Sequence, residues 1–312
     1  MRPSRSAPAV PVITLQSGLP GPRVLITAGV HGDECVGVGV IFALLEVLKT
    51  ELRAGLVFLA PSLNPEGLRR GTRALPGDER DLNRLFPGDT RGGLADRHAA
   101  AVWEELRERR PDALIDLHTD SCASIPYALV DRCVRPRADA HAVEERAWAL
   151  AEATGFTALA EYPAELYRRY QLDRSLTGAM MNVLGLPTVT VEGGPRRLLD
   201  PVAVEQATVA TLGALSALGL CRRPAPRHES HLGPGRWRRD AGPRCAAAGV
   251  LRPLVPPGGR FAAGDALAEI RGLEGQRIER LRADEAGVVI ALPERAWVEE
   301  GAVVATVAIP TR

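Results

Sequence analysis

Lysine is almost absent from this sequence. Of the 39 basic residues among 312, Lys49 is the only lysine and the other 38 are arginines. Acidic residues number 38, so the formal net charge is only +1. A nearly neutral chain is not expected to bind nucleic acid, which favours a strongly basic surface. Because the region after residue 222 contains no lysine, it cannot carry a lysine-linked lipoyl or biotinyl group.

Cysteines and long apolar runs are also scarce. The five cysteines are odd in number and form no Cys-x-x-Cys pair, which favours reduced thiols over a disulfide framework. No stretch reaches the roughly 18 apolar residues that a membrane span requires. Residues 1–6 lead into proline-containing sequence without the apolar centre of a signal peptide. We therefore expect a cytoplasmic protein with no membrane partner.

The apolar residues that are present alternate between two patterns. The length favours one large and one small domain. Short β-branched runs predict strands at 23–30, 56–63, 113–117 and 186–191. Between and after them, helical spacing predicts helices at 34–52, 94–110, 138–154 and 202–218. This alternation predicts an α/β fold with a parallel or mixed sheet.

The composition changes near residue 222. Residues 222–244 are dense in Pro, Gly, Arg and His, which predicts a linker. Beyond it, short β-like runs are separated by glycines and turns, with no helical period. We therefore predict an α/β domain over 1–221, the linker, and a small β-rich domain resembling a barrel-sandwich over 245–312.

Two histidines and a glutamate lie where predicted strands end. His31 and Glu34 form a His-x-x-Glu pair at a strand-to-helix junction, with Glu34 expected in the first helical turn, and His118 follows another strand. Zinc accepts such nitrogen and oxygen ligands, and a catalytic site takes three and keeps a position for water. Asp116 or a backbone carbonyl could orient an imidazole. Alternatively, Glu34 stabilises the helix N-terminus and His31 is a turn residue.

Glu192 ends a third apolar strand, where a carboxylate is costly unless it has a partner or a chemical task. It is a candidate general base, which would take a proton from water and deliver it to a leaving amine. The alternative is an ion pair with Arg196 or Arg197.

Three polar residues lie in loops and are candidates for binding an anion. Asn83 and Arg84 precede Leu-Phe-Pro-Gly, and Arg73 follows Gly-Thr. The guanidinium fork matches a carboxylate bidentately, and Asn adds a donor. Because the chain has 38 arginines, a solvated surface position is the alternative for each of them.

The motifs carry a resemblance when taken in order. They are His-Gly-Asp-Glu at 31–34, Asn64-Pro65 with Arg73, Asp-Leu-Asn-Arg-x-Phe-Pro-Gly at 81–88, Asp-Leu-His-Thr at 116–119 and Val-Glu-Gly-Gly at 191–194. This set resembles the succinylglutamate desuccinylase/aspartoacylase family, the acylamino-acid branch of the zinc carboxypeptidases, over about residues 20–220. The C-terminal region resembles the β-barrel appended in bacterial members. The resemblance implies an α/β, zinc-carboxypeptidase-like mixed sheet with flanking helices, plus a smaller C-terminal β-barrel-like domain.

The resemblance also implies roles for the residues at matching positions. One zinc ion per chain would be bound by His31, Glu34 and His118, and Glu192 would be the general base and acid. Arg73 would polarise the scissile carbonyl and stabilise the oxyanion. Arg80 is the alternative for this role, because Arg73 lies further from the Asn-Arg pair here than in aspartoacylase.

Substrate contacts are implied in the same way. Asn83 and Arg84 would hold a substrate carboxylate. A Tyr and an Arg four residues apart contact carboxylates in aspartoacylase, and Tyr170 with Arg174 reproduces that spacing.

The function predicted from these residues is a zinc-dependent amidohydrolase, a deacylase acting on a small N-acyl amino acid or related N-acylated amine. A zinc carboxypeptidase acting on short peptides shares the catalytic residues, and a non-catalytic binding protein shares the fold. The sequence leaves the acyl group, the amine and the oligomeric state open; a β-rich domain with exposed edges could serve as a homo-oligomer interface.

Overall fold

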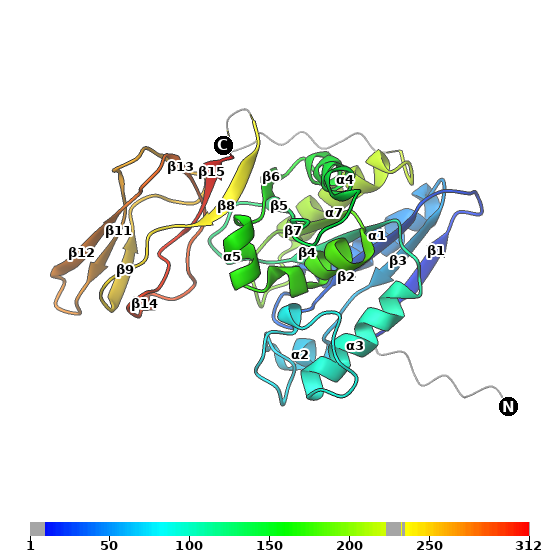
Figure 1. Cartoon of the computed structure of the whole chain (residues 1–312), viewed down its shortest axis with the longest axis horizontal. Coiled ribbons are helices and arrows are strands. Elements are labelled where there is room, and N and C mark those ends of the chain that lie inside the picture. The colour runs from blue at the N-terminus through cyan, green and yellow to red at the C-terminus, as the bar shows by residue number, and fades with distance from the viewer. Residues whose placement is uncertain (1–9, 223–231, 233–234, 312) are drawn as a thin grey trace.

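The structure of the protein, a computed structural model, describes residues 10–222, 232 and 235–311. In this part of the chain, eleven strands form one mixed sheet in the order β1-β3-β2-β4-β7-β5-β6-β8-β15-β13-β10, and four form a second sheet in the order β12-β11-β9-β14 (Figure 1). The strands of the first half are β1 (Ile13–Gln16), β2 (Arg23–Ala28), β3 (Leu56–Ala60), β4 (Ala113–His118), β5 (Tyr127–Val130), β6 (Thr157–Ala160) and β7 (Thr188–Glu192). Those of the second half are β8 (Trp237–Ala241), β9 (Gly249–Pro253), β10 (Arg260–Phe261), β11 (Ala266–Arg271), β12 (Arg277–Arg282), β13 (Gly287–Ala291), β14 (Trp297–Val298) and β15 (Thr306–Pro310).

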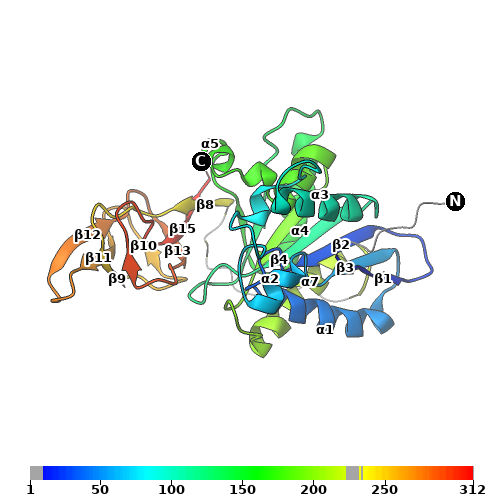
Figure 2. The ribbon, with the colours of Figure 1, turned by 90° about the horizontal axis from the view of Figure 1, so that it is seen from below.

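Helices cover both faces of the large sheet. They are α1 (Val36–Glu51), α2 (Pro65–Arg70), α3 (Leu94–Arg107), α4 (Ala140–Ala153), α5 (Ala164–Arg169), α6 (Leu176–Ala179) and α7 (Pro201–Ala217), with short turns η1 (Leu82–Arg84), η2 (Leu172–Arg174) and η3 (Met180–Leu184). One apolar core joins the sheet to α1, α4 and α7, and another joins the opposite face to α3 and α6. Figure 2 shows α1 and α3 on opposite sides of the strands. Burial on both faces explains why the central strands are continuous apolar runs.

Helix α1 packs very closely on the sheet and on α7 because one of its glycines faces each of them. A Cβ atom on Gly37 would lie 2.9 Å from the Cβ atoms of Ala28 and Leu117. A Cβ atom on Gly39 would lie 2.8 Å from the side chain of Val204 in α7. This close approach fixes the start of α1 directly over the ends of β2 and β4.

The central strands place their carboxyl ends at one edge of the sheet. Strands β2, β4 and β7 are parallel neighbours, and in the register between them Ala28 lies beside Leu117 and His118 beside Glu192. Ligand sites in α/β sheets form at such carboxyl ends. The segments that follow these strands therefore meet at one place.

The strands and helices predicted in the first half are present, with shifted ends. Helix α1 begins at Val36, so Glu34 precedes the helix instead of lying in its first turn. The reason is a tight turn, in which the Glu34 N–H donates to the His31 carbonyl at 3.2 Å. Strands β1, β5 and β6 were not expected from the sequence, since each has only four residues.

The predicted linker at 222–244 contains a strand. Strand β8 pairs antiparallel with β15 and touches β6 through Ala160 and Arg238, so it joins the C-terminal strands to the large sheet. Residues 223–231 and 233–234 of that linker lie outside the described residues. The division into domains at 1–221 and 245–312 stays a prediction.

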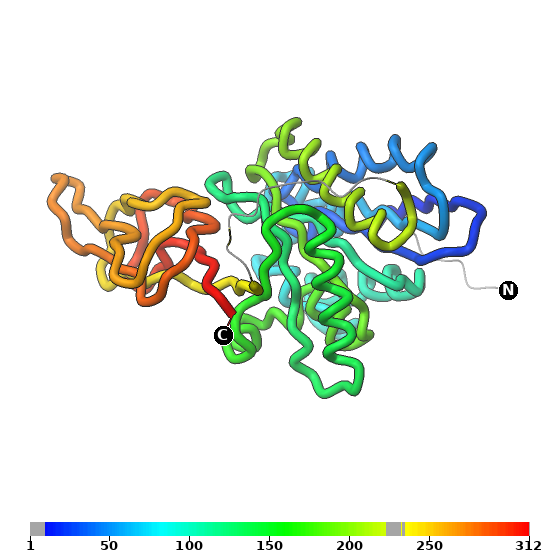
Figure 3. The backbone as a smooth tube through the Cα atoms, turned by 90° about the horizontal axis from the view of Figure 1, so that it is seen from above, coloured from blue at the N-terminus to red at the C-terminus, as the bar shows by residue number. Residues whose placement is uncertain are grey.

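The C-terminal strands form a smaller β-rich part at one end of the molecule (Figure 3). Two apolar clusters fill it, one around Leu251, Ile270 and Leu281 and one around Phe261 and Val289. The predicted fold class, an α/β mixed sheet with flanking helices and a smaller antiparallel β unit, is confirmed. None of the helices within the described ranges has the length and apolar character needed to cross a membrane.

Candidate active site

A cavity of about 130 Å³ opens at the carboxyl ends of β4 and β7. Seven residues that the sequence analysis singled out line it: His31, Glu34, Arg73, Asn83, Arg84, His118 and Glu192. They come from loops and strand ends that are far apart in the chain, and the parallel sheet brings them together.

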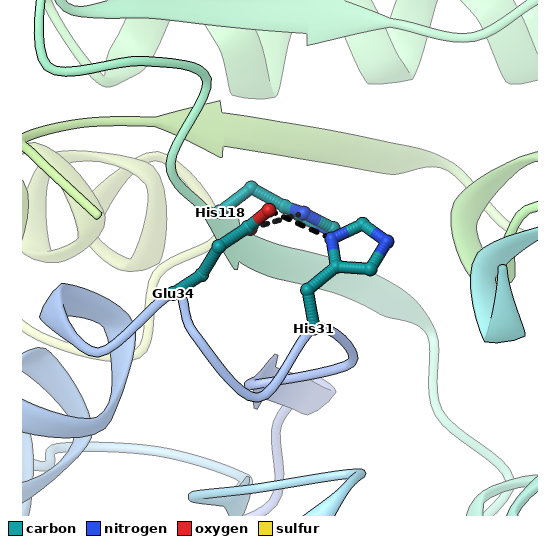
Figure 4. A group of neighbouring side chains, drawn as sticks. All are labelled: His31, Glu34 and His118. Atoms are coloured by element: carbon teal, nitrogen blue, oxygen red, sulfur yellow. Dashed lines mark hydrogen bonds and ion pairs between the residues drawn. The ribbon is translucent and has the colours of Figure 1, made fainter. Parts of the chain in front are cut away.

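The two histidines converge on one carboxylate (Figure 4). Nδ1 of His31 lies 2.8 Å from Glu34 Oε1, and Nδ1 of His118 lies 3.0 Å from Glu34 Oε2. All three side chains are buried, and one ligand atom from each lies within 4.8 Å of the others. This is a ligand set of the size that a single metal ion requires.

The far nitrogen of each imidazole is held by an aspartate. Nε2 of His31 lies 3.0 Å from Asp81, and Nε2 of His118 lies 2.9 Å from Asp116. Asp116 is fixed in turn by the Thr27 hydroxyl, which donates to it at 2.6 Å. An imidazole that donates its Nε2–H to a carboxylate turns the lone pair of Nδ1 outward as a metal ligand.

This arrangement fits a divalent cation. If each imidazole is the Nε2–H tautomer, its Nδ1 lone pair faces the Glu34 carboxylate, and a positive charge between them, a metal ion or a proton, makes that contact favourable. Burial alone would raise the pKa of Glu34, but the two imidazoles hold it well below its usual range. Burial would lower the pKa of His118, but Asp116 and Glu34 raise it well above its usual range. The buried cluster therefore fits a cation, and its mixed nitrogen and oxygen donors suit zinc.

Glu192 lies beside this cluster with a free oxygen. Its Oε2 is buried and has no hydrogen-bond partner within the described part of the chain. Burial raises the pKa of Glu192 to about 8, and Asp120 and Glu34 add to the effect while His118 opposes it. A carboxylate held in this way is suited to accept and return a proton.

The alternative ion pairs of Glu192 do not form. Arg196 donates to the Thr119 carbonyl at 3.3 Å and lies 3.6 Å from Glu34. Arg197 lies 4.0 Å from Asp33. Glu192 therefore forms no ion pair with either of these arginines.

Arg73 contacts the cluster of His31, Glu34 and His118. Its guanidinium donates to Glu34 at 3.1 Å and to Asp81 at 3.0 Å. The competing residue, Arg80, instead pairs with Asp78 at 2.7 Å and Asp96 at 2.8 Å and does not line the cavity. Of the two arginines, the structure brings only Arg73 to the cavity.

Asn83 and Arg84 present donors to the cavity. The Asn83 side-chain oxygen accepts from the Leu176 N–H at 2.8 Å, which leaves its NH₂ group as the donor end. The Arg84 guanidinium donates to the Asn83 carbonyl at 2.6 Å, and burial lowers its pKa. A buried guanidinium with further N–H groups to offer is suited to bind a carboxylate.

The structure does not bring Tyr170 and Arg174 into the cavity. The Tyr170 hydroxyl accepts from Arg244 at 3.1 Å, and its ring packs edge-on against Tyr162 with the centroids 5.3 Å apart. Arg174 lies on η2, a separate helical turn that begins after α5 has ended. Spacing alone does not keep two residues on one face when the helix stops between them.

Four charged residues of the cavity wall were missed by the sequence analysis: Asp120, Asp131, Glu161 and Arg239. Arg239, in β8, donates to both oxygens of Glu161 at 2.6 and 3.1 Å and lies over the Tyr162 ring at 4.6 Å. Asp131 and Glu161 each follow a four-residue strand, so an acid directly after a short apolar run was the available signal. Among 38 arginines, nothing local marked Arg239.

Comparison with known proteins finds the family that the sequence motifs resemble. A family model described as the succinylglutamate desuccinylase/aspartoacylase catalytic domain matches residues 20–218. Over 121 residues the chain is 34% identical to N-alpha-acetyl-L-2,4-diaminobutyric acid deacetylase of Halomonas elongata. That match covers 38% of this chain and 35% of the deacetylase, so it spans about a third of that enzyme.

Solved structures share the fold, two of those described here over nearly the whole chain. A succinylglutamate desuccinylase/aspartoacylase from Rhodobacter sphaeroides is 24% identical with a TM-score of 0.80, covering 97% of this chain and 90% of that one. A product-bound ectoine utilization protein from Ruegeria pomeroyi is 21% identical with a TM-score of 0.80, covering 96% and 89%. A metallo-carboxypeptidase from Burkholderia cenocepacia is 18% identical with a TM-score of 0.53, covering 67% and 60%. These similarities show the fold.

Proposed function

Since the chain belongs to the succinylglutamate desuccinylase/aspartoacylase family, we propose that it is a zinc-dependent amidohydrolase that removes the acyl group from the nitrogen of a small amino-acid-like molecule. The observation that carries this proposal is the pairing of two features. Both imidazoles turn Nδ1 toward Glu34 because aspartates hold their far nitrogens, and Glu192 keeps a buried, unpartnered oxygen next to them.

Different residues would perform metal binding, proton transfer and charge stabilisation. His31, Glu34 and His118 would hold one zinc ion. When bound, zinc supplies a Lewis acid that polarises the amide carbonyl and makes water acidic. Glu192 takes the proton from the attacking water and gives it to the departing amine nitrogen. Arg73 places positive charge where the carbonyl oxygen becomes negative, a preorganised contribution of the kind that matters most in hydrolases.

Recognition of the substrate falls to Asn83 and Arg84, which would bind its carboxylate. The cavity is small, about 130 Å³, whereas pockets for larger organic ligands reach several hundred Å³. This size supports a small N-acyl amino acid over a peptide. The substrate of the Halomonas deacetylase belongs to that class and is a first compound to assay. The cytoplasmic location and the oligomeric state stay predictions.

The metal is tested by elemental analysis of purified protein. We expect about one zinc per chain, with most of it lost in His118→Ala. His141→Ala is the control, because that histidine is 89% exposed on α4 and should leave the zinc content unchanged. Stoichiometric zinc in a His31→Ala/His118→Ala double variant would exclude this site.

The reaction is tested with a panel of N-acetyl and N-succinyl amino acids beside short peptides. We expect turnover of N-acyl amino acids, and Glu192→Gln should keep its zinc and lose at least about a hundredfold in kcat. Preferential turnover of peptides would favour a carboxypeptidase. Zinc-loaded protein that turns over neither class would favour a binding protein, and an active Glu192→Gln variant would mean that the base lies elsewhere.

A further inference from the structure

A second cavity, of about 840 Å³, adjoins the candidate active site. Asp120 and Arg196 line both cavities, so the two spaces meet at these residues. Apart from Ser121, the remaining wall comes from the segment 291–306, in the C-terminal strands and the loops between them. We call this space the vestibule. It is the larger of the two, since the active-site cavity measures about 130 Å³.

The vestibule adjoins a candidate metal ligand but not the residues proposed to bind the substrate carboxylate. Arg196 lies 3.6 Å from Glu34, whereas Asn83 and Arg84 line the active-site cavity and do not line the vestibule. When Asn83 and Arg84 bind the carboxylate of an N-acyl amino acid and its amide lies at Glu34, the part of the substrate beyond the amide is the acyl group. The vestibule is the space into which that group extends past Arg196.

Most of the vestibule wall is apolar. Its apolar residues include Leu292, Pro293, Ala296, Trp297 and Val303. Trp297 is 46% exposed although it is a large aromatic residue, and its indole N–H donates to Glu299 at 3.1 Å, which fixes the ring. An exposed apolar surface that lines a cavity beside an active site marks a place where a ligand binds.

The charges of the vestibule do not favour an acidic ligand. Its wall carries three carboxylates, Asp120, Glu294 and Glu299, and two guanidinium groups, Arg196 and Arg295. Arg295 is exposed to solvent. An acyl group that ends in a carboxylate would add a further negative charge to this wall, whereas a neutral chain adds none.

The two charged groups where the cavities meet have partners within the protein. Arg196 lies 3.6 Å from Glu34 and 3.9 Å from Glu294. Asp120 accepts a hydrogen bond from the Tyr127 hydroxyl at 2.6 Å. Because both groups are paired, a neutral chain that passes between them leaves neither charge without a partner.

Backbone groups of the vestibule wall are engaged as well. The Leu292 N–H donates to the Ala123 carbonyl at 3.0 Å, and the Ala296 carbonyl accepts from the Leu251 N–H at 2.7 Å. A peptide would need hydrogen-bond partners for its own N–H and carbonyl groups, whereas an aliphatic chain needs none. The wall therefore suits a hydrocarbon chain better than a peptide.

We propose that the vestibule binds an aliphatic acyl chain longer than acetyl, with Trp297 as its main apolar contact. This inference rests on the proposed function and names the acyl part of its substrate class. The amino-acid part stays in the small cavity with its carboxylate at Asn83 and Arg84, and the chain lies against Trp297.

The test is a series of acyl chain lengths on one amino acid, the one that the wild type hydrolyses best as its N-acetyl derivative. Acetyl, butanoyl and hexanoyl derivatives are compared with the N-succinyl derivative and with a dipeptide that has the same C-terminal residue. Full burial of a methylene gives about fourfold, and we expect about twofold for each one in a vestibule that is open to solvent. The kcat/KM for hexanoyl should therefore exceed that for acetyl about sixteenfold.

Two variants of the wall should lower the hexanoyl-to-acetyl ratio of kcat/KM. Trp297→Ala removes the ring, and Ala296→Asp places a charge at an exposed position that the chain would have to desolvate. The control is Ile278→Ala. Ile278 is 47% exposed on β12, at the other edge of the four-stranded sheet that contains Trp297, and does not line the vestibule. This variant should keep the wild-type ratio.

Three results would overturn the inference while leaving the deacylase proposal intact. They are equal kcat/KM for acetyl and hexanoyl in the wild type, a preference for succinyl over hexanoyl, and a hexanoyl preference that both wall variants keep. A dipeptide hydrolysed faster than the hexanoyl derivative would overturn it too, because the vestibule would then take a peptide.

Calorimetry with the fatty acids gives a readout that does not need turnover. The wild type should bind hexanoate more tightly than acetate with a more negative heat-capacity change, and Trp297→Ala should lose most of this difference while Ile278→Ala keeps it. If no N-acyl amino acid is hydrolysed, the proposed function fails, while this comparison still decides for or against the vestibule. Equal binding of hexanoate and acetate by the wild type would count against the inference.

Discussion

Two arginines near the start of β8 make the same contacts at very different depths. Arg239 binds both oxygens of Glu161 and lies over Tyr162 at 4.6 Å. Arg236 binds both oxygens of Glu145 at 2.7 and 2.8 Å and lies over Trp148 at 4.6 Å. The side chains of the first ion pair are 15% and 7% exposed, and those of the second are 45% and 42% exposed. Burial is thus the variable that separates them.

We predict that Arg239→Met strongly destabilises the protein and Arg236→Met hardly does. Removing one partner of a buried ion pair leaves an uncompensated charge and costs about 3–5 kcal/mol. At about 2.1 cal/mol/K per residue, 312 residues unfold with an entropy of about 0.65 kcal/mol/K, so the expected fall in Tm is about 5–8 °C. The exposed ion pair is solvated and screened, and its loss should leave Tm almost unchanged.

The assay is thermal unfolding followed by circular dichroism for both single variants and for Glu161→Gln/Arg239→Met. Because the double variant no longer buries a lone carboxylate, it should recover most of the lost Tm. Equal shifts for Arg239→Met and Arg236→Met would refute the role given to burial. A double variant no more stable than Arg239→Met would refute the role given to the stranded Glu161 charge.

Three further outcomes are expected. Asp116→Asn should bind zinc about 10–100-fold more weakly in a chelator competition, because a neutral amide holds the His118 Nε2–H less firmly than a carboxylate does; unchanged affinity would argue against that contact. Arg84→Lys keeps the charge but loses the forked guanidinium, so it should lower kcat/KM far more for an N-acyl amino acid than for its carboxamide analogue. The two enzymes and two substrates form a double-mutant cycle, in which additive effects would show that Arg84 does not contact the carboxylate. The pKa of Asp131 is about 7 in the folded protein and near 4 in the unfolded chain, so its contribution to stability is complete below about pH 4 and is lost as the pH rises through 7. In urea unfolding, the free energy of unfolding of Asp131→Asn should therefore depend less on pH over this range than that of the wild type. Parallel curves for the two proteins would contradict the raised pKa.

The central strands were predictable because their environment is uniform. Strands β2, β4 and β7 are buried on both faces, so each is a continuous apolar run that can be read without knowing its neighbours. Strands β5 and β6 have four residues and only their place in the sheet identifies them. Strand β8 carries three charged residues, which the sequence presents as linker. Its partners are remote, so no local pattern could reveal it.

The candidate site shows the same contrast between residues that a local sequence pattern reveals and residues that only remote contacts identify. His31, Glu34, His118 and Glu192 were found because their side-chain types at strand ends indicate chemistry. Asp131 and Arg239 could not be found in this way, because their place in the site depends on contacts with residues that are remote in the sequence. Tyr170 was chosen for its spacing, but α5 ends before it and its ring packs against Tyr162.

The contact of Arg239 with Glu161 also sets an order of events during synthesis. His31, Glu34, His118 and Glu192 leave the ribosome well before β8, so the nascent chain can assemble its central strands while β6 still has an open edge. Until Arg239 emerges, Glu161 lacks its ion-pair partner and one wall of the cavity is missing. A chain released at this stage would expose an unpaired strand, the surface from which intermolecular β-pairing starts. Completion of the candidate cavity therefore coincides with protection of the sheet against aggregation.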